Sequence, residues 1–73
     1  MVEFMPVRIE VIYSGRVLGV GFRATVLEIA TRYRVTGFVR NVPDGTVELI
    51  AEGTEAEVEA LLAEIRERFA RNL

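Results

Sequence analysis

The stretch Gly15-Arg16-Val17-Leu18-Gly19-Val20-Gly21-Phe22-Arg23 decides how this chain is organised. It joins a run of alternating apolar residues to a run with helical periodicity. Glycine lets the backbone approach a ligand closely and adopt positive φ angles, so the loop can point several N–H groups inward. The positive end of the following helix dipole and the guanidinium of Arg23 both favour an anion. The stretch therefore predicts a phosphate-binding loop between a strand and a helix.

The periodicity of apolar residues predicts three strands and two helices. A capping box, Thr54 with Glu57, marks the start of the second helix. Pro43-Asp44-Gly45 is a turn signal, so the second and third strands form a hairpin. In chain order, the expected elements are strand 7–13, a helix over 22–33, strands 35–42 and 46–52, and a helix after Thr54 that buries Val58, Leu61, Leu62, Ile65 and Phe69. This β-α-β-β-α order predicts an α+β fold, a ferredoxin-like split βαβ sandwich with its last edge strand missing.

The same order predicts where the site residues meet. A strand–helix–strand crossover is right-handed and makes its two strands parallel. The first and second strands then end on the same side of the sheet, with the antiparallel third strand between them. The glycine loop and Asn41, at the end of the second strand, are therefore expected to reach one edge of the sheet.

Two blocks of this sequence resemble the acylphosphatase family. The family's phosphate loop reads approximately GRVQGVGFR, and this chain has GRVLGVGFR at 15–23. The family's second block reads approximately G[WY]VRNxxDGxVE, and residues 37–48 read GFVRNVPDGTVE. The resemblance runs from about Val7 to the end of the second helix. It implies an enzyme, an acylphosphatase, that hydrolyses acyl phosphates to a carboxylate and phosphate.

The resemblance also implies roles for individual residues. Arg23 would bind the phosphate and Asn41 would orient the attacking water. The backbone amides that would cradle the phosphate oxygens are those of Arg16, Val17, Leu18, Gly19 and Val20, and the loop glycines are Gly15, Gly19 and Gly21. No cofactor or metal is expected. A carboxylate leaves without needing much protonation, and phosphoryl transfer depends mainly on positioning and charge neutralisation.

Two features depart from the family pattern. Leu18 stands where the family usually has Gln, which removes a hydrogen bond that could stiffen the loop. The chain also stops at Leu73, where the family continues into a final strand beside the first. The edge of strand 7–13 would then be unpaired, and an unpaired edge is a template for association. Three outcomes are open: a homodimer that pairs those edges, a partly unstable monomer, or a single domain, 1–73, that is truncated at its C-terminus.

Composition narrows the function classes. The 73 residues include no Cys, His, Lys or Trp, which excludes thiol chemistry, phosphohistidine and Schiff-base intermediates, and zinc sites of the usual kind. The formal charge of −2 argues against nonspecific nucleic-acid binding. No apolar run approaches the length that spans a bilayer, so no membrane partner is expected. The default expectation is a cytoplasmic protein that acts on a small-molecule acyl phosphate.

Two other functions compete with this interpretation. One is an acylphosphatase domain cut from a larger carbamoyl-transferring maturation protein, since such domains share the loop. The other is a non-catalytic module that keeps the fold and pairs with a partner through strand 7–13 by β-augmentation.

Overall fold

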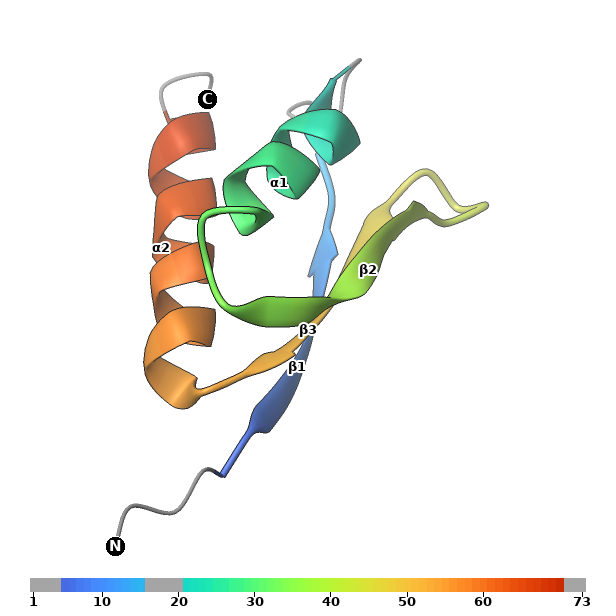
Figure 1. The fold of residues 1–73 in the computed structure, drawn as a ribbon. Coiled ribbons are helices and arrows are strands. Elements are labelled where there is room, and N and C mark those ends of the chain that lie inside the picture. Colours follow the sequence, from blue (N-terminus) through green and yellow to red (C-terminus); the bar gives the residue numbers. More distant parts are fainter. Residues whose placement is uncertain (1–4, 16–20, 71–73) are drawn as a thin grey trace, which may run out of the picture.

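The computed structural model describes residues 5–15 and 21–70 of the chain. The order of elements is β-α-β-β-α, as predicted (Figure 1). The elements are β1 (Val7–Tyr13), α1 (Phe22–Ala30), β2 (Val35–Asn41), β3 (Val47–Gly53) and α2 (Glu55–Ala70). None of the helices in this part of the chain is both long and apolar enough to cross a membrane.

The sheet has three strands in the order β1-β3-β2, and both pairings are antiparallel. β3 therefore lies between β1 and β2, and these two outer strands run parallel to each other, as the crossover argument predicted. The register aligns Val7, Gly53 and Val35 at one end of the sheet, and Tyr13, Val47 and Asn41 at the other.

Both helices pack on one face of the sheet (Figure 1). Residues directly opposite each other in an antiparallel pair point to the same face, so the odd-numbered strand residues form the helix face. The core combines residues of β3 with residues of both helices: Phe22, Val26, Ile29, Val47, Leu49, Ala51, Leu61 and Ile65, all less than 5% exposed. These are the faces that the alternation of apolar residues in β3 and their helical spacing in α1 and α2 predict. Leu62 and Phe69, also expected in the core, are only half-buried against it.

The first helix ends earlier than its periodicity predicted. It stops at Ala30, and the Thr31 hydroxyl donates a 2.6 Å hydrogen bond to the Glu28 carbonyl. Thr hydroxyls compete for helix carbonyls in this way and favour helix ends. Tyr33, which was expected on the helix, lies in the connection to β2 and still packs against the core.

The start of α2 confirms half of the predicted capping box. The Thr54 side-chain oxygen accepts a hydrogen bond from the Glu57 backbone N–H at 3.2 Å. The Glu57 carboxylate does not return to Thr54; it accepts a 2.7 Å hydrogen bond from the backbone N–H of Arg34. Glu57 therefore links α2 to the connection before β2, a contact that a local motif cannot predict.

The turn between β2 and β3 forms where the sequence predicted it. Gly45 has φ of 93°, and its N–H donates to the Val42 carbonyl at 2.9 Å. The Asp44 carboxylate accepts hydrogen bonds from the Thr46 hydroxyl at 2.6 Å and from the Thr46 N–H at 2.9 Å. These two donors hold the pKa of Asp44 below its ordinary value, since both stabilise the ionised carboxylate.

We expect the Asp44 carboxyl to titrate below the usual Asp range, in an NMR pH titration followed at that group. Because the pKa of Asp44 is lower in the folded state than in the unfolded state, the ionised carboxylate stabilises the turn at pH values above the unfolded-state pKa. This stabilisation is lost as the pH falls through the folded-state pKa. Thr46→Val removes the hydroxyl donor, so the Asp44 midpoint should move back toward the ordinary value. A wild-type midpoint at or above that value would contradict these bonds in solution.

Candidate active site

The register of the sheet brings the ends of β1 and β2 to the same edge. Tyr13, the last residue of β1, pairs with Val47, and Val47 pairs on its other side with Asn41, the last residue of β2. Since neighbouring strands lie about 4.8 Å apart, the Asn41 backbone is roughly 10 Å from that of Tyr13. All three residues belong to the helix face, so Asn41 shares that face with α1.

The first turn of α1 lies toward the same edge (Figure 1). The Phe22 ring meets the Tyr13 ring edge-on, with 5.2 Å between centroids. Gly15, which follows β1 closely, and Gly21, which precedes α1, have φ of 109° and 97°. Both conformations favour glycine, which accounts for the two glycines that flank the loop. Their places match the strand–loop–helix arrangement that the sequence predicted.

The N-terminus of α1 carries no acceptor of its own. Its N-cap residue is Gly21, which has no side chain to bind the first backbone N–H groups, and the first turn holds no acidic residue. Helix N-termini leave such N–H groups unsatisfied and carry the positive end of the dipole. Arg23, in that turn, adds a full positive charge. The start of α1 therefore has the donors and the charge that suit an anion.

Arg23 and Asn41 are both exposed. Within residues 5–15 and 21–70, no carboxylate forms an ion pair with Arg23, and the Asn41 side chain forms no hydrogen bond. The rest of the predicted loop, Arg16, Val17, Leu18, Gly19 and Val20, lies outside the described residues.

An aromatic cluster lies beneath the start of α1. Phe22 is 3% exposed and packs against Tyr13 and also against Phe69 of α2, with 4.5 Å between the Phe22 and Phe69 centroids. Burial raises the pKa of Tyr13, so this phenol stays neutral. The sequence pattern identifies Phe22 as a core residue but does not reveal that it contacts both Tyr13 and Phe69. The available signal was that Tyr13 and Phe22 flank the loop on both sides.

Arg40, the other cation near the end of β2, belongs to the opposite face of the sheet. Its Nε donates to the Glu48 carboxylate at 2.6 Å, and Arg40 is the main cause of the lowered pKa of Glu48. Arg40 is therefore paired with Glu48 on the face of the sheet that the helices do not cover.

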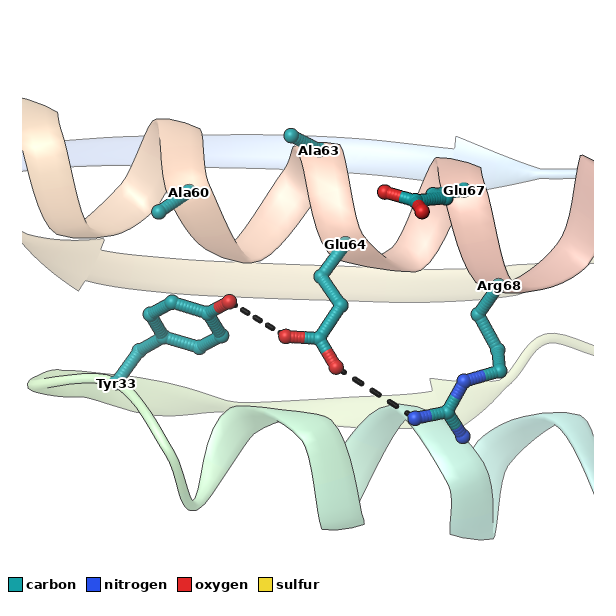
Figure 2. Close-up of a pocket in the computed structure, with 6 residues that line it drawn as sticks. All are labelled: Tyr33, Ala60, Ala63, Glu64, Glu67 and Arg68. Atoms are coloured by element: carbon teal, nitrogen blue, oxygen red, sulfur yellow. Dashed lines mark hydrogen bonds and ion pairs between the residues drawn. The ribbon is translucent and has the colours of Figure 1, made fainter.

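A hollow of about 530 Å³ lies away from this edge, between α2 and the connection after α1 (Figure 2). The Glu64 carboxylate is the common partner of the polar groups around it. It accepts hydrogen bonds from the Tyr33 hydroxyl at 2.5 Å and from Arg32 at 2.6 Å, and it forms an ion pair with Arg68 at 3.5 Å. The bond to Glu64 raises the pKa of Tyr33. Since these polar groups already satisfy one another, the cluster joins two parts of the fold and leaves little for a ligand.

The side chains that could bind a metal do not cluster in the described part of the chain. Across the described ranges, His, Cys, Asp and Glu side chains form no group of three that could hold a metal ion.

Comparison with known proteins relates this arrangement to one family. The acylphosphatase family model matches residues 9–71. Acylphosphatases of Methylococcus capsulatus and Methanospirillum hungatei are each 52% identical to the chain, over 77% and 80% of its length and 61% and 64% of theirs. The crystal structure of acylphosphatase from Bacillus subtilis matches with a TM-score of 0.77 and 36% identity, over 86% of this chain and 69% of that one.

The chain spans about three-fifths of the length of the curated relatives it matches. The residues that the family model matches include both sequence blocks, both helices, β2, β3 and β1 from Ile9 onward. The chain belongs to the acylphosphatase family.

Proposed function

We propose that this chain hydrolyses acyl phosphates to a carboxylate and inorganic phosphate. The observation that carries the proposal is the cross-strand row Tyr13, Val47, Asn41, because it puts Asn41 at the edge of the sheet where β1 ends, and Arg23 stands in the first turn of α1, which lies toward that edge (Figure 1). Family membership supports the same reaction. An acyl phosphate has a dianionic phosphoryl group for the cation and helix N-terminus to bind, and a leaving group that needs no strong acid.

The first step is binding of the phosphoryl group. Arg23 donates two parallel hydrogen bonds to phosphoryl oxygens, a geometry that a planar guanidinium suits. In this proposal, the remaining phosphoryl oxygens accept hydrogen bonds from the N–H groups at the start of α1 and from the backbone amides of residues 16–20. Fixed donors of this kind stabilise charge in the transition state without having to reorganise.

The second step is attack by water at phosphorus. The Asn41 amide both donates and accepts, so it can hold a water in line with the bond to the leaving oxygen. A new bond forms from the water oxygen to phosphorus, and the bond from phosphorus to the acyl oxygen breaks. The acyl oxygen leaves with the bonding electrons as a carboxylate, and the attacking water becomes a hydroxyl of phosphate.

The proton of the water goes to the substrate in this proposal. The site offers no His, and the row that ends at Asn41 offers no carboxylate. A phosphoryl oxygen accepts the proton directly, so the substrate assists its own hydrolysis. Because the conjugate acid of the leaving carboxylate has a pKa near 4, no general acid is needed at the other end. The reaction is therefore proposed to proceed without a metal.

Asn41→Ala tests the assignment of the water. We expect turnover to fall by about 10²-fold, because the water loses its orientation, while the inhibition constant of inorganic phosphate changes little. Steady-state kinetics with phosphate as competitive inhibitor separate the two effects. The side chain is exposed, so thermal unfolding should be unchanged. An equal loss of turnover and phosphate affinity would reduce Asn41 to a structural role.

A further inference from the structure

The first turn of α1 carries Arg23 but has no side-chain cap to hold it. Its N-cap residue is Gly21, which has no side chain to bind the first N–H groups. Phe22, the residue directly before Arg23, is 3% exposed and packs this turn into the core. The other buried residues of α1, Val26 and Ile29, lie further along the helix. The position of Arg23 therefore depends chiefly on where the Phe22 ring packs.

The Phe22 ring is held between two other aromatic rings. Tyr13, the last residue of β1, meets it edge-on with 5.2 Å between centroids. Phe69 of α2 lies on it with 4.5 Å between centroids and 43° between the ring planes. Aromatic pairs prefer offset or edge-on geometries, so such contacts define an orientation as well as a distance. The two neighbours therefore fix both the place and the tilt of Phe22.

Tyr13 also belongs to the cross-strand row that contains Asn41. It pairs with Val47, which is 4% exposed, and Val47 pairs on its other side with Asn41. The sheet holds neighbours in this row at the strand spacing of about 4.8 Å. Within the described part of the chain, the contact between Phe22 and Tyr13 thus joins the turn that carries Arg23 to the row that ends at Asn41.

We infer that Phe22 and Tyr13 are positioning residues for the proposed hydrolysis, because their contact sets where Arg23 holds the phosphoryl group relative to the water on Asn41. The inference rests on the proposed function. In-line attack needs water and phosphorus to be aligned, and a misplacement of about 1 Å can cost about 10²-fold in rate. Arg23 and the first N–H groups of α1 move together, so a displaced helix still binds phosphate but presents it to the water in the wrong place.

Phe22→Leu removes the ring contact and keeps an apolar side chain in the core. With a simple acyl phosphate as substrate, kcat should fall by about 10-fold, while the inhibition constant of inorganic phosphate changes little. Tyr13→Leu removes the same contact from the other side and should give the same pattern. Tyr13→Phe restores the ring and should recover most of the loss. Unchanged kcat in Phe22→Leu and Tyr13→Leu would overturn the inference.

The double variant Phe22→Leu with Asn41→Ala tests the route by which Phe22 acts. Alignment with a water on Asn41 has no value once the Asn41 amide is gone. The double variant should therefore turn over no more slowly than Asn41→Ala alone, since residues that act through one another show non-additive effects. Losses of kcat that multiply would overturn the inference, because Phe22 would then act independently of Asn41.

Val58→Ala is the control for stability. Val58 is 2% exposed in the first turn of α2, which follows the end of β3 opposite to the row of Tyr13 and Asn41. This variant should lower Tm, as Phe22→Leu does, and keep the wild-type kcat at a temperature well below both transitions. A matching loss of kcat in Val58→Ala would overturn the inference. Wild type that releases no phosphate would overturn the proposed function, and this inference with it.

Discussion

Arg23→Ala should abolish acyl phosphate hydrolysis while leaving the fold intact. Arg23 is exposed and, within the described chain, forms no ion pair, so its removal costs little folding free energy. In the proposed mechanism, it neutralises the charge of the phosphoryl oxygens in both the bound substrate and the transition state. Loss of an arginine that stabilises phosphoryl transfer costs about 10³- to 10⁵-fold in rate. We therefore expect a loss of at least about 10³-fold in kcat/KM.

Two further variants make this result specific. Arg23→Lys keeps the charge but loses the planar pair of donors, so activity should fall to an intermediate level. Arg66→Ala removes an exposed arginine from α2, and full activity is expected. Circular dichroism and thermal unfolding should be the same for all three variants. Near-normal activity in Arg23→Ala would refute the assignment of the phosphate site.

Gly37→Ala should unfold the protein or come close to it. The new Cβ would lie 1.9 Å from the Ile50 carbonyl oxygen and 2.8 Å from its carbon, and both atoms belong to the backbone of the central strand. φ at Gly37 is 143°, which adds conformational strain for any residue with a Cβ. Overpacking and backbone strain each cost about 1–3 kcal/mol, so the sum is about 2–6 kcal/mol. A domain of this size has little stability in reserve.

Gly45→Ala separates the two contributions. Gly45 also has a positive φ, 93°, but a Cβ there would meet nothing within 4 Å. It should therefore lose only the conformational term, about 1–2 kcal/mol. Urea denaturation of both variants provides the comparison. If Gly37→Ala were no less stable than Gly45→Ala, the close approach of β2 to β3 would be wrong.

Much of the fold was predictable because it depends on local patterns. Alternation along Val7–Tyr13 and the helical spacing of Phe22, Val26 and Ile29 identify the faces that the structure buries or half-buries. The Pro-Asp-Gly turn fixes the hairpin through φ preferences that act within four residues. The right-handed crossover makes β1 and β2 parallel, and the antiparallel β3 then fits between them, as the structure shows.

Contacts between distant residues were not predictable. Glu57 binds the Arg34 N–H instead of completing its capping box, and Tyr33 binds Glu64, 31 residues away. Ile50, whose alternation assigns it to the exposed face, is only 7% exposed and lies opposite Phe38. Each of these contacts depends on how helices and strands pack against one another, and a short stretch of sequence carries no information about that packing.

The positions of the elements that carry the predicted site residues were predictable, but the packing of side chains around those elements was not. Two motifs name Arg23 and Asn41, and topology alone brings their elements to one edge of the sheet. The packing of Phe22 between Tyr13 and Phe69 is a three-body contact from three elements, and apolar periodicity marks its members only as core residues.

The most direct test of the account is phosphate release from a simple acyl phosphate by the wild-type chain, in the presence of a metal chelator. The account predicts hydrolysis at a rate that the chelator does not change, with inorganic phosphate as a competitive inhibitor. A folded, homogeneous sample that releases no phosphate above the uncatalysed rate would contradict it, and hydrolysis that stops when chelator is added would contradict the metal-free mechanism.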